Sequence, residues 1–381
     1  MDAQDVKERE AKHEDVPGHG GAPEALHAHP DPAARPGVGS TVRLRRGVEM
    51  PQLGFGTFLS KSGGECSRAV AAALAAGYRL VDTAAAYKNE DDVAAGIRLA
   101  GLARSDVFIS TKLQAKEHGS AEQVRSALDA SLRRLGSDYV DLYLVHNPKG
   151  CNLLEVWPTM LELRDKGLAR AVGVSNFGVA QLRGLKEAGF EAPEVNQIEL
   201  HCWWQQTDVV EYHAEESIAT MAYSPLARGQ RFSAAGKTGL AGVARELGRT
   251  EAEVAIRWSL QRGHVVIPKS VDPGRIQQNT ADGFDLSAAH MAAIRRLDCG
   301  FRSIAASSRC MELPWAEVSV AGCAGNDAGA GGRGKGRGRG RDARRSASAD
   351  GDEARPAPQN ERPGDPSGVE GCRGGRARGY A

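Results

Sequence analysis

Residues 107–146 read VFISTKLQAKEHGSAEQVRSALDASLRRLGSDYVDLYLVH, with a short apolar run at each end and a longer amphipathic segment between them. The apolar side chains of that segment recur at helical spacing: Val124, Leu128, Leu132 and Leu135. Ser120 and Gln123 supply a capping box at its start. The stretch therefore predicts a strand, a helix and a second strand, in that order.

The same alternation continues in both directions along the chain. Eight Val- and Ile-rich runs are each followed by a segment of helical length: Leu53–Phe58, Arg79–Ala84, Val107–Leu113, Val140–His146, Ala169–Asn176, Glu194–Leu200, Ala219–Leu226 and Val265–Ser270. A second capping box, Thr250 with Glu253, precedes one of the helical segments. Eight strand-then-helix units predict an α/β fold, a parallel (β/α)8 TIM barrel.

An open doubly wound sheet is the alternative fold. It is disfavoured because Gly54-Phe55-Gly56-Thr57 lacks the third glycine of a dinucleotide-binding turn and no helix follows it at once. Ahead of the first run, Thr41–Met50 resembles a β-hairpin that turns at Gly47. We expect this N-terminal β-hairpin to close the bottom of the barrel.

Both ends of the 381-residue chain differ in composition from the middle. Residues 1–40 carry eight acidic and four basic side chains and almost no large apolar ones, which predicts a disordered acidic tail. Residues 322–381 contain 16 glycines and 12 basic against 8 acidic side chains, including GGRGKGRGRGR at 331–341. We therefore expect a disordered Gly/Arg-rich tail there and a barrel domain over residues 41–321.

The whole-chain charge of +1 gives no electrostatic reason to expect a nucleic-acid or membrane partner. No stretch reaches the roughly 18 apolar residues of a membrane span, and the acidic first twenty residues do not resemble a secretory signal. Seven scattered cysteines without a C-x-x-C pair favour free thiols. These features predict a cytoplasmic protein, and we expect a monomer.

Ionisable residues end three consecutive runs. Asp82, Lys112 and His146 each stand at or near the end of a predicted strand, where such barrels place their active sites, and Tyr87 follows Asp82 by five residues. A phenol is a weak acid near neutral pH, and a neighbouring ammonium is expected to lower its pKa while a carboxylate keeps the ammonium charged. The residues predict a proton relay of Asp82, Lys112 and Tyr87, with His146 holding a substrate oxygen.

Seven motifs carry a resemblance in their order and spacing: GYRLVDTAAAYKNE (77–90), STKL (110–113), LVHNP (144–148), GVSNF (173–177), VNQIEL (195–200), AYSPLARG (222–229) and IPKS…RIQQN (267–279). Together they resemble the aldo-keto reductase superfamily over residues 41–302. The resemblance implies an oxidoreductase that reduces aldehydes or ketones of small molecules by hydride transfer from NADPH. It also implies a catalytic tetrad of Asp82, Tyr87, Lys112 and His146, with Tyr87 as the general acid.

The resemblance further implies a set of cofactor-binding residues. Ser175, Asn176 and Gln197 match positions that hold the nicotinamide carboxamide, and Tyr223 matches the ring that stacks on it. Ser224 and Leu226 match the loop along the pyrophosphate. Lys269, Ser270 and Arg275 match the 2′-phosphate pocket and Asn279 the adenine contact; two cations and a hydroxyl suit a dianionic phosphate, which favours NADPH.

On the substrate side, the expected contacts are Phe58, Tyr87, His146 and Asn147. Phe58 and Asn147 depart from the tryptophans common at these positions in the superfamily. His118, in the loop after the third run, either borders the cofactor or lies in solvent, and solvent is favoured. No metal site is expected, because the histidines between the tails show no paired ligand spacing.

Two other functions remain as alternatives. Lys112 could form a Schiff base with a carbonyl substrate, although a salt bridge to Asp82 would make its ammonium a poor nucleophile. A nucleotide-binding regulatory or RNA-associated protein could act through the Gly/Arg tail, although intact catalytic positions disfavour a contact with nucleic acid as the main function. The substrate, the direction of reaction and the use of NADH are not determined by these residues.

Overall fold

A computed structural model describes residues 35–232, 239–304 and 309–319. Eight strands form one parallel sheet whose order follows the chain: β3 (Gly54–Gly56), β4 (Leu80–Asp82), β5 (Phe108–Leu113), β6 (Val140–Val145), β7 (Ala169–Ser175), β8 (Val195–Glu199), β9 (Ala219–Tyr223) and β10 (Val265–Ile267). The first and last strands meet, because Leu53 bridges Val266 and the Gly56 amide donates to the Pro268 carbonyl at 3.0 Å. The predicted (β/α)8 barrel is confirmed, and the open sheet is wrong.

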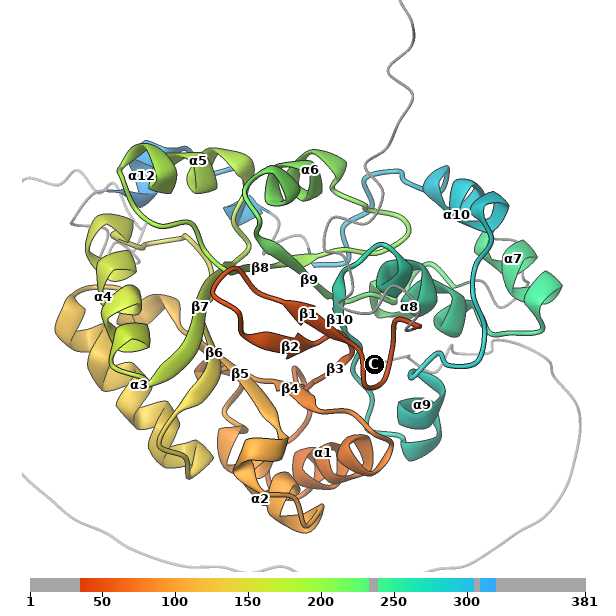
Figure 1. Cartoon of the computed structure of the whole chain (residues 1–381), viewed down its shortest axis with the longest axis horizontal. Helices are drawn as coiled ribbons and strands as arrows, with labels where there is room; N and C mark the ends of the chain where they lie inside the picture. Colours follow the sequence, from red (N-terminus) through yellow and green to blue (C-terminus); the bar gives the residue numbers. More distant parts are fainter. Residues whose placement is uncertain (1–34, 233–238, 305–308, 320–381) are drawn as a thin grey trace, which may run out of the picture. The chain divides into compact units, whose positions relative to one another are not determined.

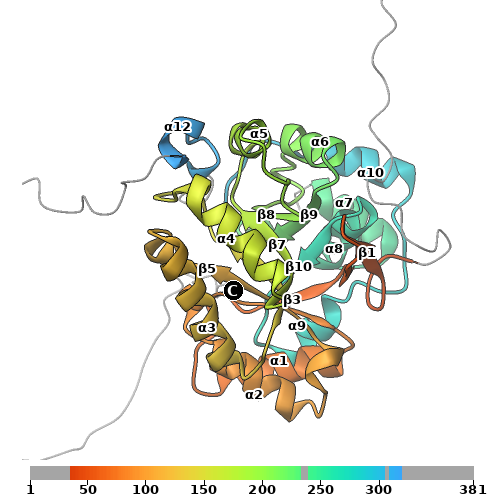
Figure 2. The same ribbon diagram turned by 60° about the vertical axis from the view of Figure 1, so that its left-hand side comes forward.

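Helices surround the ring of strands (Figure 1). Their bounds are α1 (Glu65–Ala75), α2 (Glu90–Leu99), α3 (Ala121–Leu135), α4 (Leu153–Asp165), α5 (Val179–Glu187), α6 (Thr207–Glu215), α7 (Gly239–Leu247), α8 (Glu251–Gln261), α9 (Pro273–Gln278), α10 (Ala288–Arg295) and α12 (Trp315–Val318). Helices α3 and α4 run side by side on the outside of the barrel (Figure 2). None of the described helices is long and apolar enough to cross a membrane.

Helix α3 forms as its sequence predicts. The Ser120 hydroxyl accepts from the Gln123 amide at 3.3 Å at the start, and Gly136 ends the helix in the left-handed region at φ 58°. The apolar face at Val124, Leu128, Leu132 and Leu135 is buried against the outside of the sheet. Helix α8 begins with both halves of the Thr250–Glu253 capping box. Short-range patterns therefore fix where these helices begin and what they cover.

Several strands are shorter than the apolar runs that predict them. The run to Asn176 ends as a strand at Ser175, because Asn176 takes a left-handed φ of 63°. The run to Ser270 ends as a strand at Ile267, and Pro268 has no amide N–H to continue the ladder. These early ends free the following residues to form loops at the C-terminal end of the barrel.

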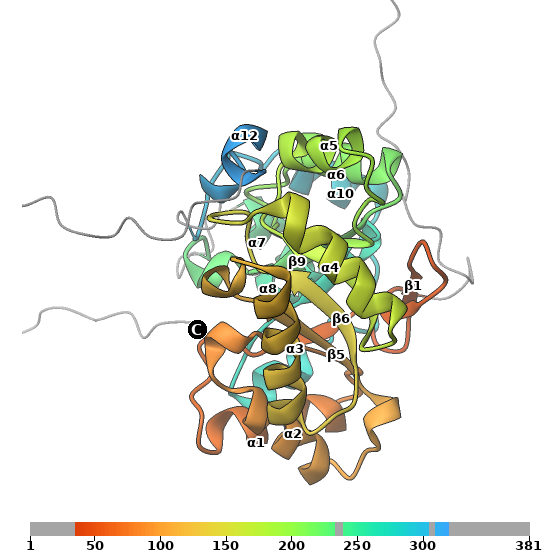
Figure 3. The ribbon, with the colours of Figure 1, turned by 90° about the vertical axis from the view of Figure 1, so that its left-hand side faces the viewer.

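The N-terminal hairpin closes the other end. Strands β1 (Thr41–Arg43) and β2 (Glu49–Pro51) pair antiparallel around Gly47, which has φ 87°. Buried side chains of this hairpin pack against the interior side chains near the start of the barrel strands: Val42, Leu44 and Met50 against Leu80, Phe108 and Leu142. Figures 1 and 3 show the hairpin across one end of the barrel. The predicted closure is confirmed.

The two predicted tails lie outside the described residues for positions 1–34 and 322–381. The domain limits at 41 and 321 therefore stay predictions. Of the seven cysteines, the five that the structure describes are free thiols: Cys66, Cys151, Cys202, Cys299 and Cys310.

Candidate active site

Side-chain alternation brings the predicted catalytic residues to one place. Neighbouring residues of a strand point to opposite faces of the sheet, so residues two apart share a face. Leu80 lies in the buried cluster inside the barrel, and Asp82 follows it two residues later. On β6, Leu144 lies in the same interior cluster, and His146 follows it by two residues and so shares its face. The parallel strands thus end with their polar side chains toward the axis at one rim.

Asp82 and Lys112 form a buried ion pair at the centre of this rim. The Lys112 Nζ lies 2.6 Å from the Asp82 Oδ1, and the two side chains are 0% and 4% exposed. Lys112 also donates to the Thr83 carbonyl at 2.8 Å. The second Asp82 oxygen, Oδ2, accepts from the Ser110 hydroxyl at 2.9 Å and the Gln197 amide at 2.8 Å. Burial lowers the pKa of Lys112 from its ordinary value, and the Asp82 carboxylate opposes that shift.

Tyr87 lies beside this pair at the end of a short 3-10 turn, Ala85–Tyr87. The Lys112 Nζ is 5.1 Å from the centre of the Tyr87 ring, and the His146 ring meets it edge-on at 5.7 Å between centroids. The expected net lowering of the pKa of Tyr87 is not found. Burial first, and the charge of Asp82 second, raise the pKa of Tyr87 well above its ordinary value. The phenol therefore keeps its proton at neutral pH, which is the form that can donate.

His146 is held as a neutral ring. Burial, followed by the positive charge of Lys112, lowers its pKa to about 3. Its backbone is fixed on both sides: the amide donates to the Leu113 carbonyl at 3.0 Å, and its carbonyl accepts from Asn176 Nδ2 at 2.9 Å. A neutral imidazole at this rim can donate one hydrogen bond to a substrate oxygen without carrying charge.

The four residues expected around the nicotinamide form one connected group. The Ser175 hydroxyl donates to the Gln197 carbonyl at 2.9 Å and accepts from Asn176 Nδ2 at 3.0 Å. The Tyr223 hydroxyl donates to the Asn176 Oδ1 at 2.8 Å. Because Gln197 also reaches Asp82, this group is continuous with the ion pair. A half-buried tyrosine ring beside clustered amide and hydroxyl groups suits a flat ring bearing a carboxamide.

The residues expected at the phosphates lie further along the same rim. Ser224 and Leu226 begin the turn after β9, where Ser224 takes φ 50°. After β10, the Ser270 hydroxyl accepts from the Arg275 Nε at 3.3 Å, and Asn279 ends α9. Burial lowers the pKa of Lys269 from its ordinary value. The negative charge of Glu65 opposes this shift, and the positive charge of Arg275 adds to it. Two cations near each other, one of them bonded to a hydroxyl, suit a dianionic phosphate.

The substrate side is more open. Phe58 is 43% exposed, and its ring centre lies 5.0 Å from that of Tyr87. Asn147 is half-buried and uses its Oδ1 to accept from the Lys149 amide at 3.0 Å. The structure thus places Phe58 against the tetrad, whereas the Asn147 oxygen serves the turn that follows β6.

Two contributors to the site were not predicted. Ser110 stands two residues before Lys112 on the same face of β5, so strand alternation could have identified it. The other contributor, the Thr83 carbonyl, is a backbone group, so the residue type at position 83 does not indicate its role.

His118, expected in solvent, is instead 1% exposed, and burial lowers its pKa to about 4. Its surroundings are set by the fold of the loop after β5, which local sequence does not reveal.

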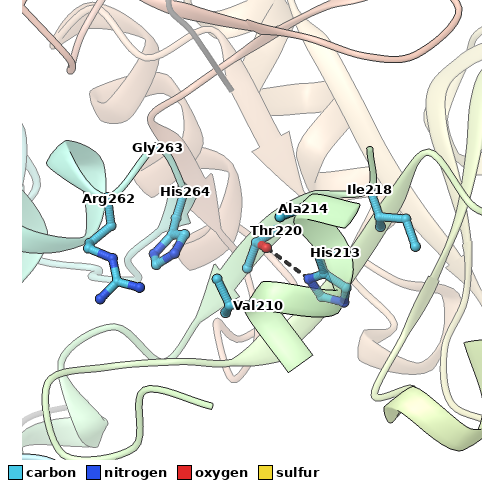
Figure 4. A pocket seen from close by; sticks show the side chains of 8 residues that line it. All are labelled: Val210, His213, Ala214, Ile218, Thr220, Arg262, Gly263 and His264. Atoms are coloured by element: carbon cyan, nitrogen blue, oxygen red, sulfur yellow. Dashed lines mark hydrogen bonds between the residues drawn. The ribbon is translucent and has the colours of Figure 1, made fainter. Parts of the chain in front are cut away.

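A small pocket lies away from the tetrad, between α6 and the residues that precede β9 and β10 (Figure 4). His213 lines it together with Thr220 and Arg262. The His213 Nδ1 bonds the Thr220 hydroxyl at 2.8 Å, and its Nε2 bonds the Asn196 amide at 2.9 Å. Both ring nitrogens thus join α6 to the sheet, and the pocket belongs to the N-terminal end of the strands.

Comparison with known proteins agrees with this geometry. The family model described as the Aldo/keto reductase family matches residues 52–298. An aldo-keto reductase of Mycolicibacterium smegmatis is 42% identical over 264 residues, covering 68% of this chain and 94% of its own. Methylglyoxal reductase DkgA of Yersinia pestis is 41% identical, covering 68% and 94%.

Solved structures show the same relationship. An aldo/keto reductase of Brucella melitensis has 40% identity and a TM-score of 0.63, covering 68% of this chain and 99% of its own. The aldo-keto reductase of Bombyx mori in complex with NADP has 32% identity and a TM-score of 0.65, covering 71% and 96%. The matched family model spans more than half of the chain and includes every residue of the Asp82, Tyr87, Lys112 and His146 group. The chain therefore belongs to the aldo/keto reductase family, whose members are oxidoreductases that use nicotinamide cofactors.

Proposed function

We propose that this protein reduces aldehyde or ketone groups of small molecules to alcohols with NADPH as the hydride donor, and that Tyr87 donates the proton. The observation that carries the proposal is the buried Asp82–Lys112 pair beside the rings of Tyr87 and His146. The NADP complex of the Bombyx mori relative and the Lys269–Arg275 pair support the choice of NADPH. The methylglyoxal reductase of Yersinia pestis among the relatives supports a small reactive carbonyl as substrate.

The chain's own residues would divide the chemistry as follows. A bound NADPH supplies the hydride for the carbonyl carbon. Tyr87, protonated at neutral pH, donates its proton to the carbonyl oxygen as negative charge develops there. The ammonium of Lys112 stabilises the phenolate left on Tyr87, and Asp82 keeps that ammonium in place. Neutral His146 donates a hydrogen bond to the same substrate oxygen and so orients the carbonyl.

The Schiff-base alternative is disfavoured by the same contacts. Lys112 is 0% exposed and its Nζ already donates to Asp82 and to the Thr83 carbonyl. A nucleophilic amine needs a free lone pair and access for the carbonyl carbon. The Gly/Arg tail, on which the RNA-associated alternative rests, lies outside the described residues.

The test uses the full chain and follows NADPH consumption with methylglyoxal and a panel of aldehydes and ketones. Tyr87→Phe should lower kcat by about 100- to 10,000-fold, since it removes the general acid. The matched control is Tyr143→Phe. Tyr143 is buried on the outer face of β6, and its hydroxyl has no hydrogen-bond partner among the described residues, so turnover should stay within about twofold. Unchanged turnover in Tyr87→Phe would contradict the acid role, and absence of NADPH consumption with every carbonyl would contradict the proposed activity.

A further inference from the structure

Asn89 stands at the N-cap of helix α2 but does not cap it. Asparagine is favoured at this position because its side-chain oxygen usually accepts from an amide of the first helical turn. In α2, all of whose residues the structure describes, the Asn89 side chain makes no such bond. Only the Asn89 carbonyl serves the helix, and it accepts from the Val93 amide at 3.1 Å. Since Asn89 is 1% exposed, its side chain must find partners inside the protein.

The side chain of Asn89 joins the loops after β3 and β4. Its Nδ2 donates to the Thr57 carbonyl at 3.0 Å and to the Ser60 carbonyl at 3.2 Å, both in the loop after β3. Its Oδ1 accepts from the Thr83 hydroxyl at 2.9 Å, directly after β4. Both amide hydrogens and the amide oxygen thus have partners, as so buried a group requires. Asn89 therefore fixes the two loops relative to each other.

The bond to Thr83 bears on the ammonium of Lys112. The Lys112 Nζ donates to the Thr83 carbonyl at 2.8 Å and lies 2.6 Å from the Asp82 Oδ1. An ammonium has three N–H groups, so two acceptors in fixed places determine where the third one points. The Nζ lies 5.1 Å from the centre of the Tyr87 ring. The direction of that third N–H therefore decides how well the ammonium stabilises a Tyr87 phenolate.

The bonds to the loop after β3 bear on the ring of Tyr87 from another side. The Ser60 amide donates to the Thr57 carbonyl at 3.0 Å, which closes a tight turn. Phe58 lies within this turn, and its ring centre is 5.0 Å from that of Tyr87. Asn89 donates to the carbonyls at both ends of the turn. The same amide thus holds the aromatic neighbour of Tyr87 as well as the acceptor of the ammonium.

We propose that Asn89 is a positioning residue for proton transfer: it fixes the Thr83 carbonyl, and with it the Lys112 ammonium, relative to Tyr87. This inference rests on the proposed function, because it concerns the proton that Tyr87 donates. It assigns Asn89 no contact with the reacting atoms. The residues expected around the nicotinamide lie on or directly after β7, β8 and β9, so cofactor binding should not depend on Asn89.

Thr83→Val tests the bond that leads to the ammonium. It removes the hydroxyl that bonds Asn89 but keeps the backbone carbonyl and nearly the same shape. We expect kcat for methylglyoxal to fall about tenfold, because the ammonium is less well aligned with Tyr87. KM for methylglyoxal and the Kd of NADPH should change less than about twofold.

Two variants control for the loss of a buried hydroxyl. Thr83→Ser keeps the hydroxyl and should hold kcat within about twofold of the wild type. Thr159→Val removes a buried hydroxyl that bonds the Glu155 carbonyl within the outer helix α4, and it should leave kcat and KM unchanged.

The Lys112→Met background distinguishes positioning from a general effect on the fold. With the ammonium gone, Thr83→Val has nothing left to misalign, so kcat should fall by less than about a further twofold. An equal tenfold loss in both backgrounds would overturn the positioning role. Unchanged kcat for Thr83→Val in the otherwise wild-type protein would overturn it as well.

Asn89→Asp tests the attachment of the β3 loop without substrate. Even when protonated, the carboxyl group has one donor where the amide has two, so at least one of the Thr57 and Ser60 carbonyls loses its partner. Amides of residues 57–60 should then exchange with deuterium at least about tenfold faster. Unchanged exchange would overturn the attachment. A wild-type protein that consumes no NADPH with any carbonyl would instead refute the proposed function, since exchange needs no turnover.

Discussion

Replacing Lys112 by methionine removes one charge from the buried pair and leaves the other. Methionine has similar length and fills the volume of the lysine stem, so packing should be conserved. Asp82 would keep the Ser110 and Gln197 donors but lose Lys112, its one cationic partner in the part of the chain that the structure describes. The side chain of Asp82 is 4% exposed, so water cannot take the place of that cation.

The expected cost follows from this burial. Breaking a buried ion pair by removing one partner destabilises a protein by about 3–5 kcal/mol. We therefore expect Lys112→Met to lower the free energy of unfolding by about that amount in urea denaturation at pH 7. Turnover should fall by at least about 100-fold, because the ammonium that stabilises the Tyr87 phenolate is gone.

The double variant Lys112→Met with Asp82→Asn separates stability from catalysis. The amide oxygen introduced at position 82 can still accept from Ser110 and Gln197, and the amide carries no charge that needs a cation. Since replacing a whole buried pair by neutral groups is often nearly neutral, the double variant should recover most of the lost stability. Its turnover should remain as low as that of Lys112→Met.

Two results would refute this reasoning. If Lys112→Met unfolds at the same urea concentration as the wild type, the ammonium does not compensate a buried charge. If the double variant regains turnover along with stability, the ion pair serves the fold alone and takes no part in proton transfer.

Two more predictions concern single groups. The pKa of His146 is about 3 in the folded protein, below its ordinary 6.5, so the unfolded chain binds a proton at this residue first as the pH falls. The free energy of unfolding should therefore fall by up to about 1.4 kcal/mol per pH unit between pH 6.5 and pH 3. His146→Gln should reduce this dependence on pH, measured by urea denaturation at pH 7 and pH 5. An unaltered slope would show that His146 is not buried as a neutral ring. Lys269→Met should raise KM for NADPH by about tenfold and KM for NADH by less than about twofold, because only NADPH carries the 2′-phosphate; equal effects on both would contradict the assignment.

Local patterns were sufficient to predict the elements of the fold. Every one of the eight apolar runs contains a strand. The barrel then followed from their order, because an alternation of strands and helices leaves few topologies open. Strand ends were predicted less well. The left-handed φ of Asn176 and the missing N–H of Pro268 end two strands early, and both depend on single residues within an otherwise continuous run.

The site shows the same division between local and long-range information. Asp82, Lys112 and His146 could be predicted to meet because parallel strands bring their ends to one rim. The contact of Asn89 with the Thr57 carbonyl joins residues 32 positions apart and leaves no periodic pattern in either segment. The burial of His118 and the raised pKa of Tyr87 likewise depend on which groups surround them in three dimensions.

The closure of the barrel between β3 and β10 has a consequence for synthesis of the protein. Strand β3 leaves the ribosome early, but the residues that pair with it, from Val266 to Pro268, follow more than two hundred residues later. At usual elongation rates of about 5–20 residues per second, that interval is roughly 10–40 s. Throughout it, one edge of β3 and the apolar side chains of the hairpin lack their final partners, including Val265 and Ile267. The nascent chain thus exposes an unpaired strand edge, which can pair with other chains, for tens of seconds. A chaperone that shields residues 41–56 during translation should increase the yield of folded enzyme.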